Sequence, residues 1–185
     1  MEKINLNKIA FIGGGAMAEA IIKGIIGSGL IAGENIAVGE HTAERCAYLN
    51  ETYGVKATTD NKEAVRDADL VIFAVKPQVA PVALTSDLVA EFKKSAWVLS
   101  IMGSVTIEML HGYAPGFPVI RTMPNTPLAV GAGMTAILLQ TNPLGVAFLC
   151  FVPRILEGFL CGLIAKLMRK TRFKKAAFYI AGISC

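Results

Sequence analysis

A glycine-rich segment near the start of the chain has the residue types and spacing of a phosphate-binding loop. Residues 13–18 follow a short apolar run and have the sequence GGGAMA, which fits the pattern G-x-G-x-x-A. In such a loop Gly13 permits a tight turn, Gly15 lets a pyrophosphate approach the backbone, and Ala18 lets the next helix pack closely on a sheet. The backbone amides that start this helix, from Ala16 and Met17 onward, would face the anion. The segment predicts a dinucleotide site, although glycine-rich turns also occur for backbone geometry alone.

An acidic residue follows at the distance that a dinucleotide site requires. Glu40 comes roughly 20 residues after the glycine-rich segment and ends a short apolar run, where a carboxylate accepts hydrogen bonds from the adenosine ribose hydroxyls of NAD. NADP would instead need a cation for its 2′-phosphate. His41 and Arg45 are candidates for that cation, although both are also typical of a solvated helix start. The sequence therefore leaves NADPH and NADH both open as cofactors.

Apolar runs of strand length alternate with stretches of helical periodicity, and this alternation sets the expected fold. The strand-like runs are residues 9–12, 36–38, 70–75, 97–101 and 119–120, and the helical stretches are 16–26, 42–53 and 79–92. Alternating strands and helices form βαβ units, whose right-handed crossovers build a parallel sheet covered by helices on both faces. We therefore predict an α/β, doubly wound, Rossmann-type fold with a mostly parallel sheet over residues 1–140.

Two further segments are expected beside the dinucleotide at the carboxyl edge of this sheet, where ligands of open α/β folds bind. Ala74-Val75-Lys76-Pro77 ends one strand and is expected to line the cofactor; the alternative is a solvated lysine followed by a helix-start proline. Asn125 lies between two prolines in residues 123–127 (MPNTP), so we expect it to hold the carboxamide or ribose of a nicotinamide. The alternative is a stiff turn in which Asn125 bonds its own backbone.

Three segments, together with the glycine-rich loop, are similar to those of pyrroline-5-carboxylate reductases. They are Asp69–Gln78 (DLVIFAVKPQ), Leu99–Ile107 (LSIMGSVTI) and Arg121–Pro127 (RTMPNTP). The resemblance covers residues 8 to about 139 and departs from the family at residues 102–104, where Met-Gly-Ser replaces a frequent Ala-Gly. It implies an NADPH- or NADH-dependent enzyme that reduces 1-pyrroline-5-carboxylate to L-proline, the last step of proline biosynthesis. Hydride transfer to a protonated imine needs mainly positioning, so we assign no catalytic side chain.

Residues 141–185 differ from the rest of the chain. Residues 1–140 carry 11 basic and 13 acidic side chains, whereas residues 141–185 carry seven and one. The net charge of +4 thus comes from the end of the chain, and no nucleic-acid partner is predicted for the main domain. The resemblance implies a helical domain at this place, which dimerises and binds the substrate carboxylate through a Gly-Ser-Gly-Pro-Ala type loop. Residues 141–185 do not match that domain.

Two explanations compete for residues 141–185. The favoured one is a truncated or frame-shifted segment in place of the helical domain, so the alternative to an active reductase is an NAD(P)-binding remnant without turnover. The other is a membrane anchor, because Leu144–Met168 is apolar and approaches the roughly 20 residues of a spanning helix. Pro153, Arg154 and Glu157 in its middle disfavour spanning, so a membrane partner is not expected.

Composition also bears on metal binding and on location. The four cysteines show none of the short paired spacings of zinc sites, so neither a metal site nor a disulfide framework is expected. Residues 1–8 lack the apolar region and cleavage site of a signal peptide. We therefore expect a cytoplasmic protein with a small-molecule substrate. The family that it resembles is homo-oligomeric, but this chain shows no match to the family's dimerisation domain.

Overall fold

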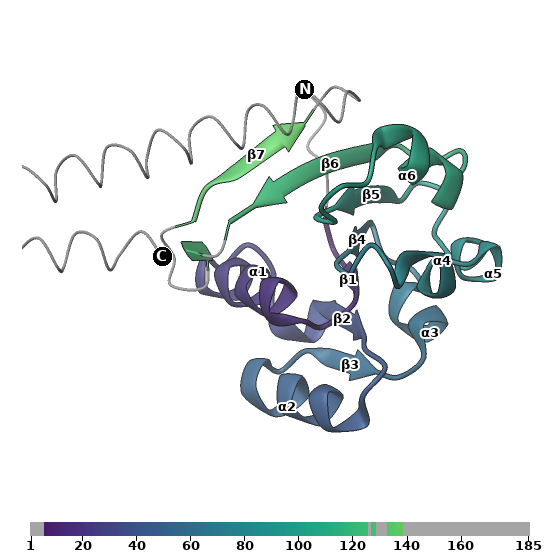
Figure 1. Cartoon of the computed structure of the whole chain (residues 1–185). Helices are drawn as coiled ribbons and strands as arrows, with labels where there is room; N and C mark the ends of the chain where they lie inside the picture. Colours follow the sequence, from purple (N-terminus) through teal and green to yellow (C-terminus); the bar gives the residue numbers. More distant parts are fainter. Residues whose placement is uncertain (1–5, 126, 129–132, 139–185) are drawn as a thin grey trace, which may run out of the picture. The chain divides into compact units, whose positions relative to one another are not determined.

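A mostly parallel sheet forms the centre of the part of the chain that the structure describes. The computed structural model describes residues 6–125, 127–128 and 133–138. Within them, seven strands follow the order β3-β2-β1-β4-β5-β6-β7 across the sheet (Figure 1). Their bounds are β1 Ile9–Ile12, β2 Ile36–Gly39, β3 Lys56–Thr58, β4 Leu70–Phe73, β5 Trp97–Ser100, β6 Val119–Pro124 and β7 Thr135–Leu138. β1 to β6 are parallel and β7 is antiparallel to β6, which confirms the predicted doubly wound α/β fold.

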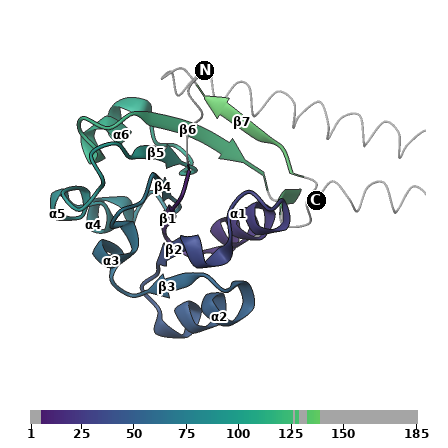
Figure 2. The same cartoon turned by 180° about the vertical axis from the view of Figure 1, so that it is seen from behind.

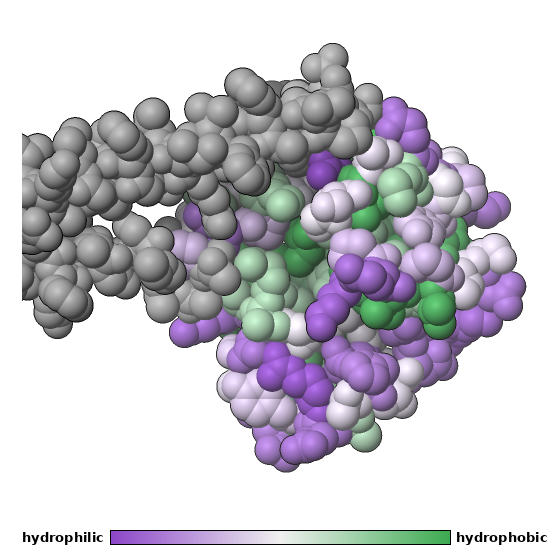
Figure 3. All heavy atoms as spheres, in the orientation of Figure 1, coloured by the Kyte–Doolittle hydropathy of each residue, from purple (hydrophilic) through white to green (hydrophobic). Residues whose placement is uncertain are grey.

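Helices cover both faces of the sheet (Figure 1 and Figure 2). They are α1 Ala16–Gly27, the 3-10 helix η1 Gly33–Asn35, α2 Ala43–Tyr53, α3 Asn61–Val65, α4 Ala80–Ala83, α5 Ser86–Val89 and α6 Ile107–Tyr113. In β1, Ala10 and Ile12 pack with residues of α3 to α6, whereas Ile9 and Phe11 pack with residues of α1 and α2. A strand that is buried on both sides needs apolar residues throughout, as β1 has. The outer side of α2 faces solvent, and Figure 3 shows mostly hydrophilic residues in that lower region.

The stretch of residues 79–92 differs from the continuous helix expected from its periodicity. It holds two short helices, α4 and α5. Leu84, at the end of α4, has φ −105° and ψ 66°, which is outside the helical region. Thr85 then caps α5, because its Oγ1 accepts a hydrogen bond from the amide of Leu88 at 3.4 Å. A threonine before a serine and an aspartate is a strong helix start, and here it outweighs the apolar periodicity.

The carboxyl ends of four strands lie in one row of the sheet. Ile12 pairs with Gly39 on one side and with Phe73 on the other, and Phe73 pairs with Ser100. Each of these residues is the last of its strand. The loops that follow β1, β2, β4 and β5 therefore meet at the same edge, which is the edge where open α/β sheets bind ligands.

Some expectations fall outside the residues that the structure describes. Residues 141–185, predicted to be an atypical segment, are among them, as is Thr126 of the MPNTP motif. Among the described helices, none combines the length and the apolar character that crossing a membrane requires. In the same residues no group of three or more metal-binding side chains comes together.

Candidate dinucleotide-binding site

A cavity of about 540 Å³ opens at the carboxyl ends of β1, β2 and β4. Six residues predicted from the sequence line it, namely Gly13, Gly15, Glu40, Ala74, Val75 and Lys76, and so does His41. Sequence reasoning missed the remaining lining residues, Ile12, Gly39, Asn61, Val79 and Ala83. Ile12 and Gly39 are the last residues of β1 and β2, so their place at the strand ends could have identified them from the sequence. The other three belong to helices or turns that carry no motif.

Gly13 makes the turn from β1 into the loop, and its position tolerates no side chain. Its φ is +100°, a conformation that L-residues rarely adopt. A Cβ atom there would lie 2.8 Å from the carbonyl oxygen of Ala74. The amide of Gly13 donates a hydrogen bond to the carbonyl of Gly39 at 2.8 Å, so the turn is joined to β2. The glycine predicted for a tight turn is therefore required by both conformation and space.

Gly15 has a different physical role from Gly13. Its φ of −70° and ψ of −179° suit any residue, and a Cβ atom there would have no protein atom within 4 Å. Gly15 is the residue before α1, so the open space adjoins the first amides of that helix, at Ala16 and Met17. These amides have no acceptor within the helix and can bind an anion. Ala18 is buried at the contact between α1 and the sheet.

Glu40 contacts the loop directly. Its Oε2 accepts a hydrogen bond from the amide of Gly14 at 2.8 Å, and its Oε1 lies 2.5 Å from Nδ1 of His41. Gly14 is closely packed, because a Cβ atom there would lie 2.8 Å from Cδ1 of Leu49. Glu40 thus holds the loop in place as well as lining the cavity. The sequence had indicated only a contact with the cofactor ribose.

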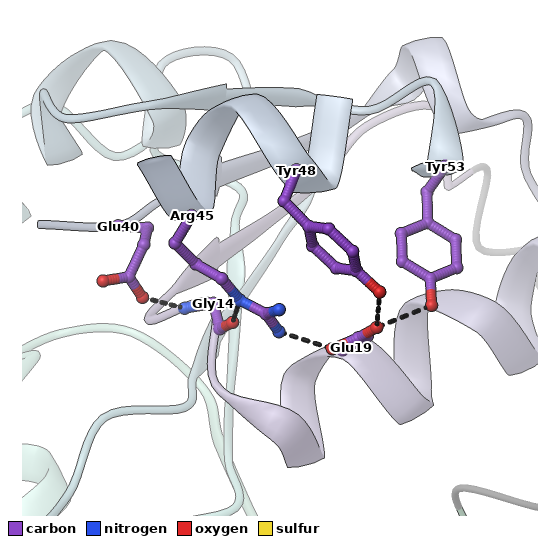
Figure 4. A network of polar contacts seen from close by, with 6 residues as sticks. All are labelled: Gly14, Glu19, Glu40, Arg45, Tyr48 and Tyr53. Atoms are coloured by element: carbon purple, nitrogen blue, oxygen red, sulfur yellow. Dashed lines mark hydrogen bonds and ion pairs between the residues drawn. The ribbon is translucent and has the colours of Figure 1, made fainter. Parts of the chain in front are cut away.

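Arg45 is bound on the other side of Gly14 (Figure 4). Its Nε donates to the carbonyl of Gly14 at 2.9 Å, and a terminal nitrogen lies 2.5 Å from Oε2 of Glu19 on α1. Its guanidinium also stacks over the ring of Tyr48, 4.9 Å from the centroid. Arg45 does not line the cavity. The residue proposed from the sequence as a cation for a 2′-phosphate therefore has partners within the fold.

Glu19, which sequence reasoning missed, connects α1 to α2. Its Oε1 accepts hydrogen bonds from the hydroxyl groups of Tyr48 at 3.0 Å and Tyr53 at 2.7 Å. Burial raises the pKa of Glu19, but hydrogen bonds from Arg45 and the two tyrosines outweigh burial and lower the pKa below its usual value. The hydrogen bond to Glu19, with burial, raises the pKa of Tyr53 to about 12. The glycine loop therefore begins a helix that is fixed to its neighbour by a charged group.

The segment after β4, residues 74–77, first lines the cavity and then enters a turn. Ala74 and Val75 are half-buried and Lys76 is exposed, and all three line the cavity. The carbonyl of Lys76 accepts the amide of Val79 at 2.9 Å, which starts the turn toward α4. Pro77 lies in that turn and does not line the cavity. Its predicted contact with the cofactor stays a prediction.

Asn125 lies at the end of β6, on the surface. Its Oδ1 accepts a hydrogen bond from the amide of Met134 at 2.8 Å, and its own amide donates to the carbonyl of Met134 at 3.2 Å. The side chain thus bonds the backbone of a residue nine positions away, across the β6–β7 connection, and not its own backbone as in the alternative interpretation of this motif. Asn125 does not line the cavity described above, and its contact with a nicotinamide stays a prediction.

Comparison with known proteins identifies the family. The family described as NADP oxidoreductase, coenzyme F420-dependent, matches residues 8–103, which is just over half of the chain and includes all six predicted residues in the cavity. The chain belongs to this family. The match ends shortly after β5, so β6 and β7 lie beyond it.

Pyrroline-5-carboxylate reductases are similar over a longer stretch. That of Synechocystis sp. is 42% identical over 130 residues, or 70% of this chain and 48% of that protein. The solved structure from Coxiella burnetii is 33% identical with a TM-score of 0.66, over 72% of this chain and 49% of that one. The Plasmodium falciparum structure, which has NADP bound, is 25% identical with a TM-score of 0.58, over 78% and 53%. These findings confirm the resemblance seen in the sequence. The chain spans about half the length of the curated relatives that it matches.

Proposed function

We propose that this chain binds NADPH or NADH in the cavity at the ends of β1, β2 and β4, as the cofactor domain of a pyrroline-5-carboxylate reductase. The reaction is reduction of 1-pyrroline-5-carboxylate to L-proline, the last step of proline biosynthesis. The observation that carries the proposal is the open space at Gly15, beside the first amides of α1. The fold itself does not require a glycine at this position, because a Cβ atom there would meet no protein atom. The similarity to pyrroline-5-carboxylate reductases supports the choice of substrate.

The residues around the cavity have separate tasks in this proposal. The amides of Ala16 and Met17 bind the pyrophosphate, and Glu40 accepts hydrogen bonds from the adenosine ribose. Val75 and Lys76 line the side of the cavity toward the reacting end. Reduction of the imine C=N bond takes a hydride at carbon, which a bound dihydronicotinamide supplies, while the nitrogen already carries its proton. The protein then contributes position and exclusion of water more than acid–base chemistry.

The setting of the reaction is part of the proposal. A small-molecule substrate and a cytoplasmic location fit a biosynthetic reductase. The main domain carries slightly more acidic than basic side chains, which disfavours a nucleic-acid partner. Homo-oligomerisation is what the relatives' family implies for a complete reductase.

A binding titration followed by a turnover assay tests the proposal. The purified chain is titrated with NADPH and NADH, and oxidation of the tighter binder is then measured with 1-pyrroline-5-carboxylate. Binding of at least one dinucleotide is the expected result, and turnover would show that this chain alone is a working reductase. Binding without turnover would refute reductase activity by this chain alone and leave a cofactor-binding domain. If neither dinucleotide binds, the assignment of the cavity is wrong.

A further inference from the structure

The adenosine end of the cavity presents a carboxylate. Glu40 ends β2 and is only 9% exposed, yet it lines the cavity. The amide of Gly14 donates one hydrogen bond to Oε2, and Nδ1 of His41 lies against Oε1. Because each carboxylate oxygen accepts two hydrogen bonds, both oxygens keep a free position. The group can therefore accept from ribose hydroxyls without giving up its contact with the loop.

The basic side chains near the Glu40 carboxylate either have protein partners already or follow a strand farther along the sheet. Arg45 is held by the Gly14 carbonyl and by Glu19 (Figure 4). It does not line the cavity. Both ring nitrogens of His41 have protein partners, since Nδ1 contacts Glu40 and Nε2 lies 3.1 Å from Oγ1 of Thr42. Lys76 lines the cavity but follows β4, which lies two strand spacings from β2, or roughly 10 Å. Among the described residues that line the cavity, the cation beside Glu40 is therefore His41, and its Nδ1 already contacts that carboxylate.

From these contacts we infer that the site prefers NADH to NADPH, with Glu40 as the residue that determines this specificity. The inference rests on the proposed function, because it concerns the same cavity. A 2′-hydroxyl donates a hydrogen bond to the carboxylate, whereas a 2′-phosphate would place a second negative charge beside Glu40, whose neighbouring His41 is already in contact with the carboxylate.

Dissociation constants for NADH and NADPH test the inference in the purified chain. The wild-type chain is expected to bind NADH at least about tenfold more tightly, at low salt, where charge repulsion is least screened. Glu40→Gln keeps an oxygen for the Gly14 amide but removes the charge. It is expected to reduce the preference to less than about threefold, chiefly by tightening NADPH binding. AMP and adenosine 2′,5′-bisphosphate, used as competitors, should show the same order because they occupy only the adenosine end.

Matched variants separate specificity from loop structure. Arg45→Met and Lys76→Met are expected to leave the ratio of the two dissociation constants unchanged, even where both affinities fall. A selective loss of NADPH binding in either variant would overturn the inference, since that side chain would then hold the 2′-phosphate. Tighter binding of NADPH by the wild-type chain would overturn it as well, whether or not the glutamine variant folds. If neither dinucleotide binds, the proposed function fails and the preference with it.

Discussion

Two glycines of the same loop are expected to lose very different amounts of stability on the same substitution. Gly13→Ala places a methyl group 2.8 Å from the Ala74 carbonyl oxygen at a φ of +100°. A left-handed conformation costs an L-residue about 1–2 kcal/mol, and relief of the overlap requires a further shift, so we expect a loss of about 3 kcal/mol. For a chain of this size that corresponds to a fall in Tm of about 6–12 °C. Gly15→Ala meets no atom within 4 Å and should change the free energy of unfolding by less than about 1 kcal/mol.

Gly15 is expected to matter for dinucleotide binding and not for stability. The space beside Gly15 is where the pyrophosphate is proposed to lie, so Gly15→Val should abolish dinucleotide binding while the domain still melts cooperatively. Thermal unfolding followed by circular dichroism gives the stabilities, and titration calorimetry with NADH gives the affinities. A Gly13→Ala variant with the wild-type Tm would show that the approach to Ala74 does not constrain the turn. A Gly15→Val variant with wild-type affinity would show that the pyrophosphate lies elsewhere.

Two ionisable groups outside the cavity give further predictions. Burial raises the pKa of Asp69, but hydrogen bonds from Lys93 and two backbone amides outweigh it and hold the pKa below its usual value. Asp69→Asn should therefore cost about 1–3 kcal/mol at neutral pH and progressively less as acid protonates the wild-type carboxylate, as denaturant titrations at several pH values would reveal. Asp87→Asn, whose exposed ion pair is 4.0 Å long, is the matched control and should cost less than about 0.5 kcal/mol. Tyr53, with its pKa of about 12, should ionise at lower pH in Glu19→Gln, as tyrosinate absorbance would show, because the hydrogen bond to Glu19 is lost while burial remains. In the wild-type chain the contribution of this group to stability is present below about pH 10 and lost as the pH rises through 12. An unchanged titration curve would contradict the role given to Glu19.

The strands that the sequence revealed are those covered by helices on both faces. β1 and β4 are continuous apolar runs because both of their sides are buried, which leaves an unmistakable pattern. β3, Lys56–Thr58, lies at the edge of the sheet and is only partly buried, so its residues show no apolar run. Among the strands that the structure describes, β7 pairs with β6 alone, and the described side chains of Thr135–Leu138 are exposed. β3 therefore depends on pairing rather than on composition, whereas β7, with the sequence TAIL, carries an apolar signal that sequence reasoning missed.

Site residues were predictable where spacing within one βαβ unit determines them. Gly13 and Glu40 fall in this class, because the turn after the first strand and the end of the second have fixed positions in such a unit. The bonds that immobilise the loop are of another kind. Gly14 meets Glu40 across 26 residues of sequence, and Glu19 meets Tyr53 across 34. No local pattern encodes these contacts, since they depend on how α1 and α2 pack together.

The loop around Gly14 is bonded from three directions, by the Gly39 carbonyl, the Glu40 carboxylate and the Arg45 guanidinium. Its shape is therefore set before any ligand arrives. Fixing the backbone of one residue costs roughly 1–2 kcal/mol of conformational entropy, so ordering three residues on binding would lose about 3–6 kcal/mol of affinity. In the folded domain these residues are already ordered, so dinucleotide binding does not lose this conformational entropy. A free peptide with the sequence of residues 13–18 would lose this entropy whenever it bound a pyrophosphate, so its affinity for pyrophosphate should be very low.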